Sequence, residues 1–180
     1  GRSFQACIAL NSITIPSTVT SIGNSAFNGC TSLPTVTIPN SVTSMGDNVF
    51  YGCTSLKSIY LHGGGNDITV GDYAFYNCTS LESIPADLFK PFGTAKLKFS
   101  QTFEGCKSLK SIPEGLFAAN TATTHFAGAF IDCTALESVP ENLLASCANL
   151  TYVNKMFSGC TSLKSVPEKF FAGNPKIITF

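Results

Sequence analysis

The sequence contains no tryptophan and few charged side chains, since lysine, arginine, aspartate and glutamate make up only 12% of its 180 residues. Soluble domains usually carry about 25%. The 11 acidic and 11 basic residues balance, so no net charge favours nucleic acid or an anionic membrane. No apolar run reaches the roughly 18 residues that crossing a bilayer requires. We therefore expect neither a nucleic-acid partner nor a membrane span in this chain.

Residues that could support catalysis or hold a metal are also scarce. The two histidines, His62 and His125, lie far apart in the sequence, so neither can activate more than one nucleophile. The cysteines do not form the close Cys-x-x-Cys pairs of zinc sites, and the nearest two are Cys147 and Cys160. The glycine-rich stretch 63–67 lacks the lysine of a phosphate-binding loop, which favours a turn or bulge. The sequence therefore predicts no catalytic residue, metal or cofactor, and no enzyme.

What the sequence does contain is a repeated motif. Six segments share the frame Phe-x-x-Cys-x-x-Leu. Their phenylalanines are Phe27, Phe50, Phe75, Phe103, Phe130 and Phe157, and their cysteines are Cys30, Cys53, Cys78, Cys106, Cys133 and Cys160. Successive cysteines are separated by 23, 25, 28, 27 and 27 residues, and a partial copy starts at Cys7. Repeats of this length indicate a solenoid in which each turn contacts only its neighbours.

A short strand is predicted after each of these cysteines. Leucine and isoleucine or valine alternate with polar residues, so the apolar side chains point inward and the others face solvent. The segments are 10–15, 33–38, 81–84, 109–112, 136–139 and 163–166. Stacked copies would form a parallel sheet with strands about 4.8 Å apart. A proline follows each segment and ends the strand, because proline cannot donate to the ladder.

Two kinds of repeat follow one another along the chain. Residues 1–84 hold short repeats, each with a second short strand closed by glycine and then a single helical turn, as over Ala26–Phe27. Residues 85–180 hold long repeats, in which a proline, mostly followed by glutamate, predicts the start of a short helix. These prolines are Pro85, Pro113, Pro140 and Pro167. The second strands of the long repeats are predicted at 96–99, 123–126, 150–153 and 177–180.

These frames are similar to a known family of repeats. The frame Leu-x-x-Ile-x-Ile-Pro-x-x-Val-x-x-Ile-Gly-x-x-Ala-Phe-x-x-Cys, from Leu10 to Cys30, resembles the BspA-like leucine-rich repeats, and Met156 to Leu163 resembles a sister subtype. The resemblance covers essentially the whole chain. It implies an α/β repeat solenoid of 23–28-residue leucine-rich repeats with a parallel β-sheet, a second short strand and short helical turns. We expect one domain over residues 1–180, divided at 84/85 into the two subtypes.

The same resemblance implies a location and a class of partner. Members of this family are secreted or surface-anchored proteins, mainly of mouth and gut anaerobes and of some protists. Those implicated in adhesion bind host matrix proteins or other cells, and the family shares no catalytic residues. The resemblance therefore implies an extracellular or cell-surface protein with a protein or cell-surface ligand.

The two most regular columns are interpreted as core. The phenylalanine column could form an aromatic binding stripe, but its invariance across copies favours a buried stack of rings. The cysteine column could form disulfides in a secreted protein. Because each cysteine occurs once per turn in the same frame, we prefer a ladder of reduced, buried thiols that act as small hydrophobes.

Two exposed columns could meet a partner. The residue after each strand leucine alternates in sign over five turns, as Lys57, Glu82, Lys110, Glu137 and Lys164. We interpret this charged ladder first as stabilising the sheet and its register, and second as a face that greets a partner. In the long repeats the second-strand position varies, as Lys98, His125, Tyr152 and Thr179. Variation within a regular frame is where solenoids place recognition, so Lys98, His125 and Tyr152 are the candidate partner-binding face.

Three functions remain open from the sequence. The first is a protein-binding or adhesion module of a bacterial surface protein, which rests on architecture and resemblance. The second is a glycan-binding module for nutrient capture, although Tyr60 and Tyr152 are the only tyrosines expected on strand faces. The third is a passive spacer in a longer array of repeats.

Overall fold

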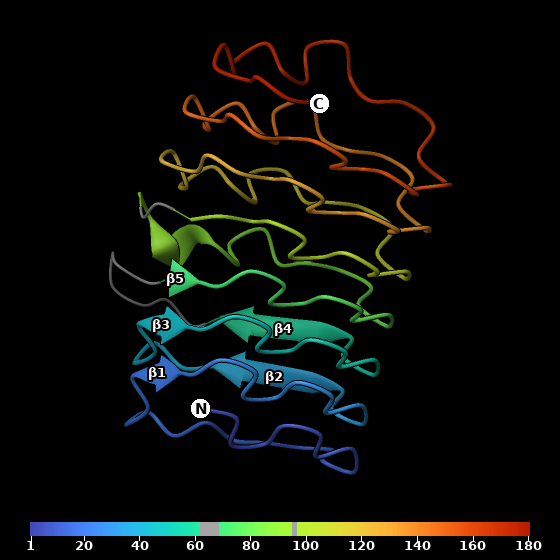
Figure 1. The fold of residues 1–180 in the computed structure, drawn as a ribbon. Helices are drawn as coiled ribbons and strands as arrows, with labels where there is room; N and C mark the ends of the chain where they lie inside the picture. The colour runs from blue at the N-terminus through green and yellow to red at the C-terminus, as the bar shows by residue number, and fades with distance from the viewer. Residues whose placement is uncertain (62–68, 95–96) are drawn as a thin grey trace.

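The computed structural model describes residues 1–61, 69–94 and 97–180. The chain winds as a series of turns stacked on one another, and its two ends lie at opposite ends of the stack (Figure 1). The predictions for His62 and for the glycine-rich stretch 63–67 lie outside the described residues. Within the described parts, no helix has the length and apolar character needed to cross a membrane.

Two parallel sheets run through the short repeats. Strands β1 (Ser21–Ile22), β3 (Ser44–Met45) and β5 (Thr69–Val70) form one sheet in the order β1-β3-β5. Strands β2 (Thr35–Ile38) and β4 (Ser58–Leu61) form the other, with Val36 opposite Ile59. Side chains alternate between exposed and buried along β2, as a strand with one face on the core requires. The predicted parallel sheet and second strand are confirmed in these repeats.

Strand pairing is reduced to single bridges in the long repeats. The bridges join Ser111 to Ser138 and, in a second row, Lys98 to His125, His125 to Tyr152 and Tyr152 to Thr179. The predicted strands at 81–84 and 163–166 are not formed. The reason lies in the position of proline, which follows four residues after the strand leucine at Pro113 but six residues after it at Pro39. The earlier proline removes the N–H that would extend the ladder.

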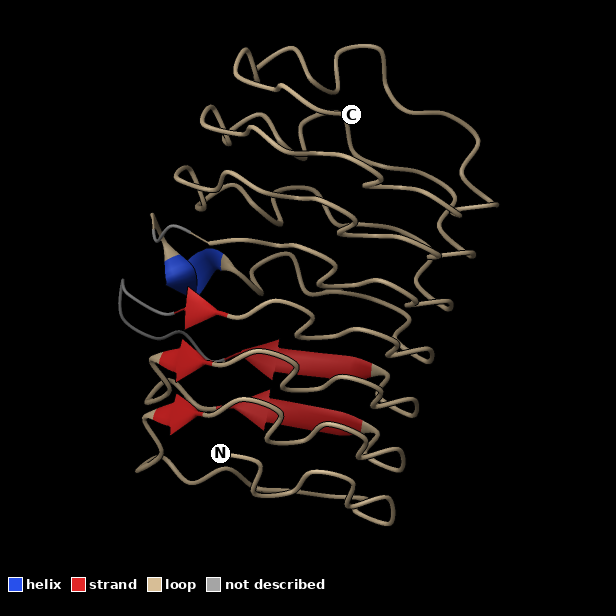
Figure 2. Ribbon diagram, viewed as in Figure 1, coloured by secondary structure: helices blue, strands red, loops and turns tan. Residues whose placement is uncertain are grey.

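The predicted short helices after Pro85, Pro113, Pro140 and Pro167 are wrong. Each segment folds as isolated turns, and the helix of the described chain is the 3-10 helix η1 (Lys90–Phe92), which Figure 2 shows as its one helical segment. Single turn bonds close after three of the prolines, for example from Leu88 N–H to Pro85 O at 3.0 Å. A helix needs several such bonds in succession to offset the cost of its first turn.

The predicted helical turn over Ala26–Phe27 is also wrong, for a different reason. Ser25 has a φ of 57°, which is outside the right-handed helical region. The N–H groups of Ser25, Phe27 and Gly29 donate to carbonyls of the next turn. Donors used between turns cannot close a helix within their own turn.

These bonds between turns recur along the whole chain. The phenylalanine N–H of one turn reaches a carbonyl of the next at 2.9 Å for Phe27 to Val49 and at 3.0 Å for Phe75 to Thr102. The residue before each cysteine of the column has a positive φ. Glycine fills this position in four of the six full copies, and Asn77 and Asp132 fill it in the other two. A Cβ on Gly105 would collide with the Asn77 side chain of the previous turn, so glycine is required next to Asn77.

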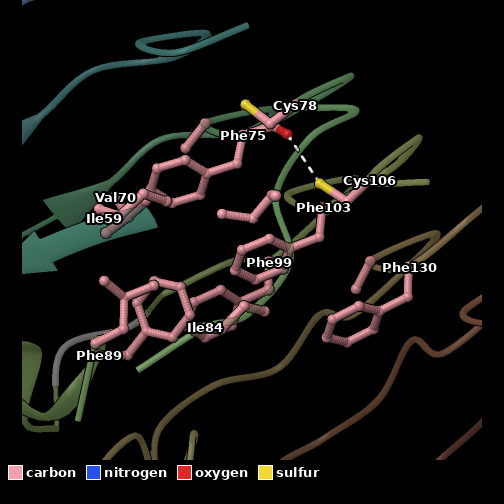
Figure 3. Close-up of a cluster of buried hydrophobic side chains, with 14 of the residues drawn as sticks. Ile59, Val70, Phe75, Cys78, Ile84, Phe89, Phe99, Phe103, Cys106 and Phe130 are labelled. Atoms are coloured by element: carbon pink, nitrogen blue, oxygen red, sulfur yellow. Dashed lines mark hydrogen bonds between the residues drawn. The ribbon is translucent and has the colours of Figure 1, made fainter. Parts of the chain in front are cut away.

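The phenylalanine column is a continuous stack inside these turns. Neighbouring rings are nearly parallel, with centroids 5.3 Å apart for Phe27 and Phe50 and 5.8 Å apart for Phe130 and Phe157. Figure 3 shows Phe75, Phe103 and Phe130 in this arrangement. Phe4 adds a further ring, 5.3 Å from Phe27. The copy that the sequence suggested to start at Cys7 therefore begins at Phe4 and is complete.

The cysteine column is a ladder of free thiols, as preferred from the sequence. All eight cysteines are unpaired. Each column thiol from Cys30 onward donates to the carbonyl of the phenylalanine one turn back, for example from Cys106 Sγ to Phe75 O at 3.4 Å (Figure 3). Burial raises the pKa of Cys53 to about 12. These thiols stay neutral and satisfy a carbonyl that would otherwise be buried without a partner.

Cys147 belongs to a second column that the sequence analysis missed. Its equivalents in the neighbouring turns are Asn120 and Asn174. The Asn120 amide donates to Phe89 O at 3.0 Å and Gly93 O at 3.1 Å, and Asn174 repeats this pattern one turn beyond Cys147. Cys147 Sγ lies 3.7 Å from Asn120 O, in the same role. The signal was the regular spacing of 27 residues between Asn120, Cys147 and Asn174.

Truncating the phenylalanine stack should be costly. Phe103 is fully buried and lies 5.5 Å from Phe75 and 5.4 Å from Phe130, ring to ring. We expect Phe103→Ala to lower the free energy of unfolding by about 3–5 kcal/mol, because it leaves a cavity in a packed core. Denaturant unfolding followed by circular dichroism measures this. Phe180→Ala is the control, since Phe180 is 80% exposed, and an equal loss in both variants would contradict the stack.

Thiol reactivity should follow burial along the column. We expect a thiol-specific disulfide reagent at neutral pH to modify Cys7 rapidly in the folded protein, because Cys7 is the one exposed cysteine. After unfolding without reductant, all eight cysteines should react. A count near zero in the unfolded, unreduced protein would mean that the column is disulfide-bonded.

Candidate functional site

The structure brings the three residues of the candidate partner-binding face into one column. Parallel bridges join Lys98 to His125 and His125 to Tyr152. The neighbouring residues Phe99, Phe126 and Val153 are buried and anchor each rung in the core. Strand alternation then turns Lys98, His125 and Tyr152 away from the core, and Tyr152 is 37% exposed.

His125 and Tyr152 form a stacked pair at the centre of this face. Their ring centroids are 4.4 Å apart with an interplanar angle of 27°. Thr124 Oγ1 lies 2.7 Å from His125 Nδ1 and fixes the ring from its other edge. Burial and then the positive charge of Lys98 lower the pKa of His125, and the Asp72 carboxylate acts in the opposite direction. The imidazole is therefore neutral at pH 7, which suits it for stacking on the phenol.

Lys98 is an exposed cation without an ion pair. Within residues 1–61, 69–94 and 97–180, the one salt bridge joins Lys164 to Glu137. Asp72 acts on the charge of Lys98 and His125 but does not approach Lys98 to ion-pair distance. Asp72 Oδ1 is shielded from solvent, and burial, followed by repulsion from Asp47, raises the pKa of Asp72.

The charged ladder is also in register. Glu137 N–H donates to Lys110 O at 3.0 Å, and Lys57 N–H donates to Pro34 O at 2.9 Å, so these residues occupy equivalent positions in neighbouring turns. All five side chains, including Glu82, are exposed. The Lys164–Glu137 pair spans 3.7 Å with side chains 79% and 57% exposed. A pair this exposed contributes at most about 1 kcal/mol, and the stabilising role of the ladder stays a prediction.

A tyrosine cluster lies on a surface that the sequence analysis did not single out. The Tyr51 and Tyr76 rings stack with centroids 4.5 Å apart, and Tyr73 packs against Tyr76 at 5.8 Å. Burial and the neighbouring Glu104 carboxylate raise the pKa of Tyr76. Tyr51 and Tyr76 each follow a phenylalanine of the repeat directly, and that shared position was the signal for their stacking.

Other hollows of the surface hold no candidate chemistry. A pocket of about 360 Å³ at the N-terminal turn is lined mainly by apolar residues, among them Phe4, Ile13 and Val19. A second, of about 480 Å³, lies between two long repeats and is lined by small and charged residues, among them Ala86, Lys90 and Glu114. In the described part of the chain, no group of three or more histidine, cysteine or carboxylate side chains is placed to hold a metal ion.

Comparison with known proteins is consistent along most of the chain. The sequence matches the protein family described as BspA type Leucine rich repeat region (6 copies), over residues 1–88 and 98–176. It is similar to a leucine-rich repeat protein of T. pallidum, with 28% identity and a TM-score of 0.53, over 86% of this chain and 74% of that one. It is also similar to a leucine rich cell surface protein from Faecalibacterium prausnitzii, with 26% identity and a TM-score of 0.55, over 82% of this chain and 42% of that one. No curated protein gives a significant match.

The coupling between Lys98 and His125 can be measured. We expect Lys98→Gln to raise the pKa of His125, because it removes a positive charge that disfavours the imidazolium. An NMR titration of the imidazole protons gives this pKa, with the signal assigned by a His125→Gln variant. Lys110→Gln, in the charged ladder, should leave it unchanged. An unchanged or lower pKa in Lys98→Gln would show that the two side chains do not interact.

Proposed function

The chain belongs to the family of BspA-type leucine-rich repeats, and on that premise we propose that it is a non-catalytic module that binds a protein partner. The family supports a role in protein interaction. The observation that carries the proposal is the column of Lys98, His125 and Tyr152, where three chemically different side chains project from consecutive, otherwise regular turns. An ammonium and two aromatic rings in contact are the kinds of groups that anchor protein interfaces.

We propose a location on the surface of a bacterial cell or in its surroundings. The similarity to a leucine rich cell surface protein from Faecalibacterium prausnitzii supports this location. The partner would then be an extracellular protein, such as a host matrix protein, or a protein on another cell, and the module would serve adhesion.

We also propose that residues 1–180 form one solenoid domain. The phenylalanine stack supports this, since it passes from the short repeats of residues 1–84 into the long repeats of 85–180 without a break between Phe75 and Phe103. The thiol ladder crosses the same boundary through the bond from Cys106 to Phe75. A shared core of this kind would hold the candidate face rigidly, which lowers the entropy lost on binding.

Glycan binding is the second candidate function. It is favoured by two tyrosines with accessible rings, Tyr60 in β4, which is 49% exposed, and Tyr152 in the candidate face. Aromatic rings offer apolar surface with a polar edge, which suits a sugar. A passive spacer in a longer array is the remaining possibility, since it requires no binding face at all.

A binding screen tests the proposal. The purified protein would be immobilised and exposed to a panel of extracellular matrix proteins and glycans. We expect a protein hit whose affinity falls by at least about tenfold in Lys98→Ala/His125→Ala/Tyr152→Ala, because interface anchors contribute most of the binding energy.

The matched control carries three substitutions in the charged ladder, Lys57→Ala/Lys110→Ala/Lys164→Ala, and should keep its affinity. Circular dichroism confirms that both triple variants are folded. A hit that only the ladder variant loses would place the partner on the charged ladder instead. A glycan hit would favour the second function, and no hit at all would favour a spacer.

A further inference from the structure

The candidate face carries an unbalanced positive charge. Around the column, residues 97–101, 124–128, 151–155 and 178–180 include Lys98, His125 and Lys155 but no aspartate or glutamate. The acidic residues of the long repeats lie in other columns, at Asp87, Glu104, Glu114, Asp132, Glu137, Glu141 and Glu168. The chain as a whole is neutral, so its charges are segregated and this surface attracts anions.

The cations of this face are available to a partner. Lys98 and Lys155 are exposed, and neither takes part in an ion pair within the described residues. Lys176, in the following turn, donates to Asn149 Oδ1 at 2.6 Å and thereby adds a further cation without a carboxylate partner. The carboxylate that acts electrostatically on the column, Asp72, is half-buried with one oxygen shielded from solvent, so it does not neutralise Lys98 by contact.

We infer that the Lys98–His125–Tyr152 face binds an acidic peptide segment of the partner, with a carboxylate against the Lys98 ammonium and an adjacent side chain against the stacked His125–Tyr152 rings. The inference rests on the proposed function and names the chemistry of its partner. Two rungs of about 4.8 Å separate Lys98 from Tyr152, and roughly three residues of an extended peptide span that distance. Three residues can present both a carboxylate and a packing side chain.

The face also has a means of responding to pH. The titratable groups that act on or pack against His125 are Lys98, Asp72 and Tyr152. With the pKa of His125 lowered, the imidazole is neutral at pH 7 and gains its proton on acidification. A bound carboxylate stabilises the imidazolium, so the affinity for an acidic segment rises as the pH falls toward about 5.5, where glutamate is still ionised.

Labelled peptides of defined charge provide the test. Fluorescence anisotropy would compare a peptide of alternating glutamate and serine with matched glutamine–serine and lysine–serine peptides at low salt. We expect the glutamate peptide alone to bind, about fivefold more weakly in Lys98→Gln, because an exposed charge pair contributes up to about 1 kcal/mol. Lys110→Gln, a matched lysine of the charged ladder, should bind as the unaltered protein does. Acidification from about pH 7.5 to about pH 5.5 should tighten binding roughly twofold to fivefold, and His125→Gln should abolish that gain.

The possible results separate the inference from the proposed function. No binding of the glutamate peptide, equal binding of the glutamine peptide, or an equal loss in Lys110→Gln would overturn the acidic-segment inference. The protein-binding role would still stand if a partner from the panel lost affinity in the Lys98/His125/Tyr152 triple variant. Dextran sulfate serves as a second probe. If it binds in a Lys98-dependent manner and the glutamate peptide does not, the face takes an anionic polysaccharide, and the inference of a peptide is wrong.

Discussion

The hydrogen bonds between successive turns at the Phe-x-x-Cys segment are the constraint on which the rest of the structure depends. The N–H of Phe27 reaches Val49 O at 2.9 Å, and Phe130 reaches Met156 O at the same distance five copies further on. These bonds can recur only if each segment has the same length. In the six full copies, five residues always separate the positive-φ or glycine position, such as Ser25, from the column cysteine, such as Cys30. The repeats vary from 23 to 28 residues, and the variation falls outside this segment.

A constant rise per turn makes every position of the repeat into a column. The phenylalanine rings stack because their backbones are already held at stacking distance, and the thiols reach the carbonyl one turn back for the same reason. On the outer surface the same spacing places His125 and Tyr152 ring to ring at 4.4 Å. A recognition face on this scaffold is therefore specified by one residue per turn. Its chemistry can change by single substitutions, while the core columns keep the rung positions fixed.

Most of the fold followed from the spacing of the repeats, because a periodic frame with apolar columns has few ways to bury them. The columns of phenylalanine, cysteine, Lys98–His125–Tyr152 and the charged ladder were all placed in register correctly. The helices were not, because Pro85 and its equivalents signal a helix start locally, while the demand for bonds between turns is a tertiary effect that single segments do not reveal. The stack at Phe4 and the amide pairs of Asn120 were present in the sequence as spacings. The charge environment of Lys98 depends on which columns become neighbours, and only the folded chain gives that.

The direction of the bonds between turns has a mechanical consequence. They run along the axis of the stack, and the two ends of the chain lie at its opposite ends (Figure 1). A force pulling the termini apart would therefore load the bonds of a terminal turn in tension, and would not shear many rungs together. Each turn is bonded only to its neighbours, so turns would detach one at a time from an end, each releasing more than twenty residues of slack. Under tension the chain would lengthen in steps at a modest load, and the turns that carry the Lys98 face would stay folded until the peeling reached them.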